Sequence, residues 1–173
     1  LNQSGTAERA RVVTRAHWWF DTNALIDFPD HANLDIGASD DFSLAFSGRS
    51  YDVTPGSSNS PISKRTSGGY EVQLHTSGVW RAVWHDGSVS FTDDASGTDG
   101  EAVTIVTVRN VADDDGEIFL NGTGSGSPTT DNTTSSLANA LTLRLGSQPG
   151  GNNDYQGEIY QAFIFRSAKS DSE

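Results

Sequence analysis

The carboxylates of this chain are the side chains best suited to chemistry. Of its 23 acidic residues, 17 are Asp, and they gather in short clusters where turns are predicted. The clusters are Asp40-Asp41, Asp93-Asp94, Asp113-Asp114-Asp115 and Asn152-Asn153-Asp154. Calcium takes about six to eight oxygen ligands, several of them carboxylates, but Asp and Asn are also ordinary turn residues. We expect no resident cofactor, and calcium in one of these loops stays an open alternative.

The same carboxylates show no arrangement typical of a glycoside-cleaving enzyme. Retaining glycosidases hold two carboxylates about 5 Å apart, which acids at alternating positions of one strand can provide. The predicted strands carry the single acids Glu71, Glu117 and Glu158, and we find no partner for them two residues away. The four histidines show no spacing typical of a Ser-His-Asp triad. We therefore predict that the chain is not an enzyme.

Aromatic residues are the second candidate group, because an exposed ring can hold a sugar or a protein surface. Trp18 and Trp19 are adjacent, so on a strand they face opposite sides and one of them is expected at the surface. Trp80 and Trp84 share one face and are expected in a core. The candidate residues for a glycan site or a protein interface are Trp18, Trp19 and Tyr155.

Arg9, Arg11 and Arg15 form the only basic cluster of the sequence, within a polar segment. We predict that residues 1–15 are an N-terminal arm and that residues 16–173 are one domain. A basic arm on an acidic body suits docking onto an acidic neighbour. These three arginines are therefore the candidate assembly residues.

The net charge of −12 narrows the range of partners. Such a field repels phosphate backbones, so we expect no nucleic acid. No stretch approaches 18 apolar residues and no charged-then-apolar leader opens the chain, so we expect neither membrane insertion nor a signal peptide. An Asp-rich surface with two lysines is what a halophilic host produces; a GC-rich genome, which favours Arg over Lys, is the alternative.

The elements that must position these residues are short strands. Clusters of Gly, Ser, Thr, Asn and Asp recur every 8–15 residues between β-rich runs, a pattern typical of an all-β sandwich with little helix. Segment 123–136 has no side chain suited to a core and is predicted to be a long surface loop. Strands are expected at residues 70–75, 79–84, 88–91, 103–108, 117–120, 141–145 and 159–165, the last with a bulge.

The order of several short motifs resembles that of laminin-G-like domains of the concanavalin A-like lectin/glucanase fold. The resemblance covers residues 16–173. Phe46 stands where the family usually has Trp, and Tyr160-Gln161 stands where it has Asp-Glu. The similar segments are Ala24–Phe28, Asn33–Gly37, Asp41–Phe46, Ile62–Lys64, Gly69–Leu74, Val103–Arg109, Gly116–Gly122, Leu141–Gly146 and Tyr155–Phe165.

The resemblance implies an all-β fold, a two-sheet antiparallel jelly-roll sandwich. It also implies binding to glycans or protein surfaces, in some members with calcium. A core can absorb Phe46, whereas Tyr160-Gln161 removes two acids from the last strand and weakens any polar site transferred there.

Two functions fit these observations. We favour a non-catalytic structural or attachment module displayed on a larger assembly, such as a head-decoration, turret or tail protein of a tailed virus of a halophilic or GC-rich host. Its partners would be other subunits of that assembly, and the chain would be a homo-oligomer. The alternative is a glycan-binding, lectin-like module of a secreted or cell-surface protein. The expected location is the virion surface or the extracellular space.

Overall fold

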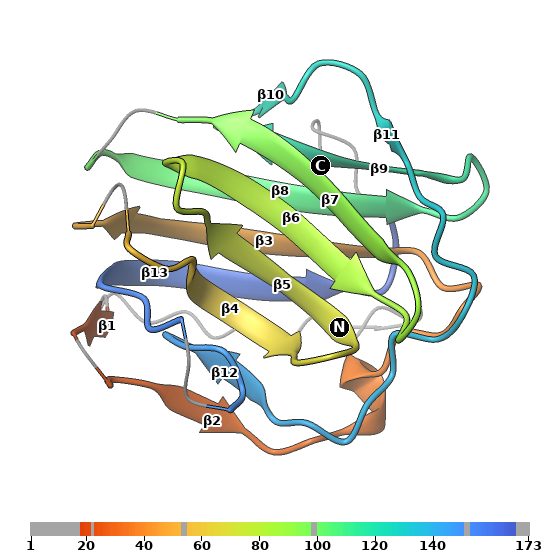
Figure 1. Cartoon of the computed structure of the whole chain (residues 1–173), viewed down its shortest axis with the longest axis horizontal. Helices are drawn as coiled ribbons and strands as arrows, with labels where there is room; N and C mark the ends of the chain where they lie inside the picture. Colours follow the sequence, from red (N-terminus) through yellow and green to blue (C-terminus); the bar gives the residue numbers. More distant parts are fainter. Residues whose placement is uncertain (1–17, 22, 53–54, 98–99, 151–152, 169–173) are drawn as a thin grey trace, which may run out of the picture.

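The computed structural model describes residues 18–21, 23–52, 55–97, 100–150 and 153–168. These residues form two antiparallel sheets, and Figure 1 shows one sheet lying in front of the other. Within the described ranges the helical structure is a single 3-10 turn, η1 (Ala32–Leu34). The two-sheet antiparallel sandwich with very little helix that the sequence predicts is confirmed.

The first sheet joins the two ends of the described chain. β1 lies at one edge and pairs with β13, so residues 18–20 lie beside residues 157–159. The strand order is β1 (Trp18–Phe20), β13 (Gly157–Phe165), β3 (Phe42–Ser50), β8 (Ala102–Asn110), β9 (Asp115–Leu120) and β10 (Thr123–Gly124), and β11 (Thr129–Thr130) also pairs with β9.

The second sheet covers the other side of the core. The strands β4, β5, β6 and β7 follow one another along the chain and end at the edge strand β7, while β12 and β2 lie at the other side of the sheet (Figure 1). The strand order is β2 (Ile26–Phe28), β12 (Leu143–Leu145), β4 (Asn59–Arg65), β5 (Gly69–Leu74), β6 (Val79–His85) and β7 (Ser90–Ser96).

The core lies between the two sheets and is rich in aromatic rings. Trp80 and Trp84, which alternate on β6, are both buried, as the sequence predicts. The Trp84 ring stacks on Phe91 of β7 at a centroid distance of 3.7 Å and meets Phe42 of β3 edge-on. Phe42 belongs to the first sheet and Trp84 to the second, so these contacts fasten the two sheets together.

Several strand boundaries differ from the sequence prediction. Asp93 and Asp94 lie within β7 rather than in a turn, and β9 begins at Asp115 rather than at Glu117. The predicted bulge in the last strand is confirmed, because the register with β3 shifts between Ile159 and Gln161.

The segment 123–136 is not the plain surface loop that its composition predicts. It contains β10 and β11, and it contributes the buried residues Asp131 and Thr133. Arg109 of β8, itself buried, donates from Nε to Asp131 Oδ2 at 2.7 Å and from Nη2 to Thr133 Oγ1 at 3.2 Å. Polar residues can lie in an interior when a buried partner satisfies them, and composition alone does not reveal that partner.

Candidate functional site

The most distinctive surface feature is a group of aromatic and charged side chains on the outer face of the first sheet. We call it the Trp19 cluster and define it as Trp19, Arg49, Tyr51, Glu158 and Tyr160. It spans the three neighbouring strands β1, β13 and β3 at one edge of the sheet (Figure 1). The register places Trp19 opposite Glu158, and Glu158 opposite Arg49. Directly opposed residues on one face of a sheet have adjoining side chains.

The alternation of β1 places Trp19 on the surface. Phe20 is buried and Trp18 packs against the core, so the residue between them faces outward. The side chain of Trp19 is 63% exposed. Of the two adjacent tryptophans, the structure therefore presents Trp19 outward and leaves Trp18 half-buried beneath the strand.

Tyr51 extends the exposed aromatic surface. It follows β3 directly, and its ring lies 4.9 Å from the Trp19 ring, with an interplanar angle of 33°. Tyr51 is 42% exposed. The guanidinium carbon of Arg49 lies 5.6 Å from the centre of the Tyr51 ring, within the range of a cation–π contact. Two exposed rings and a cation therefore adjoin one another.

Glu158 orders the polar side of the cluster. Tyr51 Oη donates to Glu158 Oε1 and Tyr160 Oη donates to Glu158 Oε2, each at 2.6 Å. The hydrogen bond to this carboxylate raises the pKa of both Tyr51 and Tyr160, so both phenols stay protonated at neutral pH. The Glu158 carboxylate holds Tyr51 in place through its hydroxyl group, so this hydrogen bond does not use the faces of the Tyr51 ring.

Tyr155, the third aromatic candidate from the sequence, is not at this surface. It is fully buried, and its ring meets Phe46 edge-on at 5.9 Å. Burial also raises its pKa. The ring that lies beside Trp19 is Tyr51, not Tyr155. Tyr51 could not be predicted from the sequence, because its position at the end of a strand shows no periodicity of its own.

The candidate assembly residues Arg9, Arg11 and Arg15 lie outside the described residues, so the arm proposed for residues 1–15 stays a prediction. The described part of the chain has no helix long and apolar enough to cross a membrane.

The side chains of the Asp93-Asp94 cluster are engaged in structural contacts. Asp93 accepts hydrogen bonds from the Ile118 amide and from the Ser125 and Thr129 hydroxyls. Asp94 pairs with Arg81, at 2.6 Å. Among the described residues, no group of three or more His, Asp or Glu side chains could hold a metal ion.

Strand β9 carries a pair of acidic residues. Because β9 begins at Asp115, Asp115 and Glu117 alternate on one strand and share a face. Burial and the charge of Asp113 raise the pKa of Asp115. The expectation that Glu117 has no acidic partner two residues away is therefore wrong.

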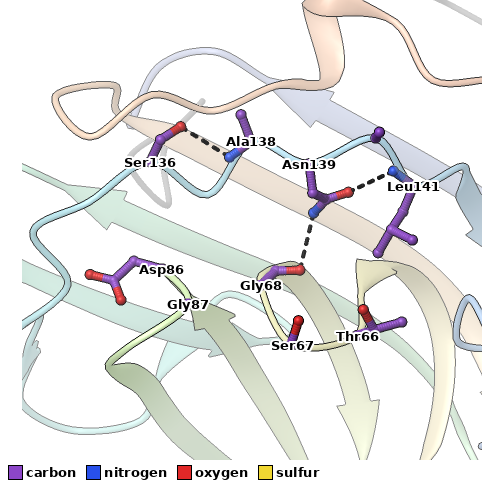
Figure 2. Close-up of a pocket in the computed structure, with 10 residues that line it drawn as sticks. Thr66, Ser67, Gly68, Asp86, Gly87, Ser136, Ala138, Asn139 and Leu141 are labelled. Carbon is purple, nitrogen blue, oxygen red and sulfur yellow. Dashed lines mark hydrogen bonds between the residues drawn. The ribbon is translucent and has the colours of Figure 1, made fainter.

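A separate hollow of about 390 Å³ lies between loops at one end of the sandwich. Figure 2 shows Asn139 in it, donating from its side chain to the Gly68 carbonyl and accepting from the Leu141 amide. Asp86, also in its wall, accepts from the backbone amides of residues 88, 89, 134 and 135. These side chains hold the loops together, so the Trp19 cluster is the better candidate for a ligand.

The comparisons with known proteins agree with this architecture. Residues 20–173 match the model of the concanavalin A-like lectin/glucanases superfamily. No curated protein sequence matches the chain significantly.

Solved structures with the same fold include the binding domains of clostridial toxins. The binding domain of Paraclostridial Mosquitocidal Protein 1 is 15% identical, with a TM-score of 0.72 over 90% of this chain and 41% of that one. The botulinum neurotoxin serotype G binding domain is 11% identical, with a TM-score of 0.71 over 90% of this chain and 40% of that one.

A third structure is of botulinum neurotoxin type C, whose cell entry depends on interaction with two ganglioside molecules. It is 11% identical, with a TM-score of 0.67 over 86% of this chain and 37% of that one. The chain thus spans about two-fifths of the length of these toxin chains. The family match covers nearly all of the sequence, so the chain belongs to the concanavalin A-like lectin/glucanase superfamily.

Proposed function

We propose that this chain is a non-catalytic carbohydrate-binding module that holds sugar rings on the Trp19 cluster. The observation that carries the proposal is the contact between two exposed rings, Trp19 and Tyr51, beside the polar groups of Glu158 and Arg49. Sugars are amphipathic in the same way: their C–H faces pack on aromatic rings, and their hydroxyls hydrogen-bond to polar side chains at the rim.

The energetics favour a ligand over an empty surface at this position. Hydration of an exposed Trp ring is unfavourable in free energy. A ligand that covers about 80 Å² of the ring would gain about 2 kcal/mol of binding free energy, at about 25 cal/mol per Å². Contiguous exposed aromatic surface of this kind marks interaction sites. Glu158 fixes Tyr51, which reduces the entropy lost when a ligand orders the ring.

The class of ligand is supported by the family and by one neighbour. Lectins give the superfamily part of its name, and type C botulinum neurotoxin interacts with gangliosides, which are glycan-bearing lipids. At 11% identity that neighbour shares the fold, so the location of the proposed site rests on this chain's own surface. A module of this kind acts in the extracellular space, where glycans are displayed.

The hypothesis of a virus-decoration protein was the favoured one from the sequence. It rests on the compact sandwich together with the arm at residues 1–15, which lies outside the described residues, and it stays a prediction. The exposed Trp19 surface favours the glycan-binding alternative instead.

A glycan array with two matched variants tests the proposal. Trp19→Ala removes the exposed ring, and Phe28→Ala removes another exposed ring, 39% accessible, from β2 on the opposite sheet. We expect the wild type and Phe28→Ala to bind the same glycans, and Trp19→Ala to bind them about five- to thirtyfold more weakly, from a loss of about 1–2 kcal/mol.

Two results would overturn the proposal. The first is an absence of binding to every glycan, with Trp19→Ala instead abolishing capture of a protein partner, which would make this surface a protein interface. The second is release of reducing sugar from a bound glycan, lost on Glu117→Gln, which would make the chain an enzyme.

A further inference from the structure

The charge of the ligand can be inferred from the cation of the Trp19 cluster, an inference that rests on the function proposed above. Arg49 differs from the other described cations in lacking a carboxylate partner among the described residues. The other six are ion-paired: Lys64 with Asp30 and Asp35, Arg65 with Glu71, Arg81 with Asp94, Arg109 with Asp131, Arg144 with Asp27, and Arg166 with Asp40. An unpaired guanidinium is unexpected in a chain of net charge −12.

The carboxylate nearest to Arg49 along the sheet, Glu158, is hydrogen-bonded to two tyrosines. The register of β13 and β3 places Glu158 directly opposite Arg49, where a cross-strand ion pair would be expected. Both oxygens of Glu158 instead accept from the phenols of Tyr51 and Tyr160. Each phenol takes one acceptor position of this carboxylate, and the ion pairs of the described residues do not include one between Glu158 and Arg49.

The position of the Arg49 side chain is also fixed. Its Nε donates to the Gly100 carbonyl at 2.5 Å, and the guanidinium lies against the Tyr51 ring. The two terminal nitrogens, Nη1 and Nη2, have no hydrogen-bond partner among the described residues. A guanidinium anchored through Nε presents these two nitrogens as a fork, the geometry that pairs with a carboxylate or a sulfate through two parallel hydrogen bonds.

We propose that the glycan bound at the Trp19 cluster is acidic, and that its carboxylate or sulfate pairs with Nη1 and Nη2 of Arg49 while a neighbouring sugar ring packs on Trp19 and Tyr51. Carboxylates more than about 8 Å away weaken this cation little, because salt at physiological strength screens them. The nearby Glu158 carboxylate shares its charge with the hydrogen bonds from two phenols. Arg49 selects for the charge, and the two rings supply affinity that is independent of charge.

Matched ligands and matched variants test this inference. The ligands are lactose, sialyllactose and sulfated lactose, followed by an array in which each neutral glycan is paired with its carboxylated and sulfated forms. The variants are Arg49→Met, Arg49→Lys and the control Arg81→Met. The control changes the net charge equally but removes an arginine of β6, on the opposite sheet. Thermal unfolding of each variant checks that it is folded.

We expect the wild type to prefer the acidic member of each pair, and Arg49→Met to weaken binding of that member about tenfold or more. Arg49→Lys keeps the charge but loses the fork and should give an intermediate affinity. Arg81→Met should bind as the wild type does. Comparison of the carboxylated and sulfated arms identifies which anion is recognised.

The outcomes separate this inference from the function on which it rests. Equal binding of neutral and acidic forms, with no effect of Arg49→Met but a loss in Trp19→Ala, overturns the acidic ligand and leaves the glycan module standing. An equal loss in Arg49→Met and Arg81→Met attributes the preference to net charge and overturns the role of Arg49. An absence of binding to all glycans overturns both.

Discussion

Replacing Arg109 tests whether the buried polar cluster beneath the first sheet holds the loops of the sandwich. Its side chain is 1% exposed and pairs with Asp131, which is 3% exposed. The guanidinium also donates to the carbonyls of Gly37, Ala38, Asp40 and Thr133. It thus joins β8 to two loops that are distant in the sequence.

The expected cost of Arg109→Met follows from the charge it leaves behind. Removing one member of a buried ion pair costs about 3–5 kcal/mol, because the remaining carboxylate is buried without its counterion. A domain of this size is stable by about 5–15 kcal/mol. The variant should therefore lose about a fifth of its stability or more, and its melting temperature should fall by about 10 °C.

Urea unfolding followed by tryptophan fluorescence measures this loss. Arg81→Met is the control, because its pair with Asp94 is partly exposed and should contribute about 1 kcal/mol or less. The double variant Arg109→Met/Asp131→Leu removes both buried charges and should be more stable than Arg109→Met alone. The reasoning fails if Arg109→Met costs no more than Arg81→Met, or if the second substitution adds its full cost to the first.

Three further predictions concern other parts of the molecule. Four backbone amides hold the pKa of Asp86 far below its usual value. The stability that Asp86 provides should therefore be complete above about pH 4 and be lost as the pH falls further. In an acid titration, the free energy of unfolding of Asp86→Ala should fall less steeply with pH than that of the wild type. Gly116→Ala should destabilise the sandwich by about 1–3 kcal/mol in urea unfolding, because the added methyl group would overlap the Trp84 and Phe91 rings. Tyr155→Ala should lower the free energy of unfolding by about 3–5 kcal/mol, because Tyr155 is buried in the core. Trp19→Ala should leave the melting temperature within about 2 °C of the wild type, because Trp19 is exposed. A larger loss of stability in Trp19→Ala than in Tyr155→Ala would contradict these positions.

The strands could be predicted from the sequence because their side chains alternate. Tyr70, Val72 and Leu74 point into the core from β5, and Trp80 and Trp84 do so from β6, as period-two patterns require. These patterns depend on neighbours along the chain, which a sequence displays directly. The order and spacing of short motifs along the sequence then indicated the family, which the family match confirms.

The candidate site could be predicted only in part, because it depends on pairing between distant segments. Alternation alone indicated that Trp18 and Trp19 face opposite sides, but the core contact of Trp18 decides which of them is exposed. Tyr51 and Glu158 are 107 positions apart, and only the pairing of β3 with β13 brings them together. The burial of Asp131 likewise depends on Arg109, 22 positions away.

The measurement that tests the central claim most directly is a titration of the four tryptophan indole N–H signals by NMR with a glycan selected on the array. Trp19 is 63% exposed, whereas Trp80 and Trp84 are buried in the core. The proposed function predicts that the Trp19 signal shifts in proportion to saturation, while the Trp80 and Trp84 signals stay within their baseline scatter. A saturating shift confined to other resonances, with the Trp19 signal unmoved, would contradict the placement of the glycan site on the Trp19 cluster.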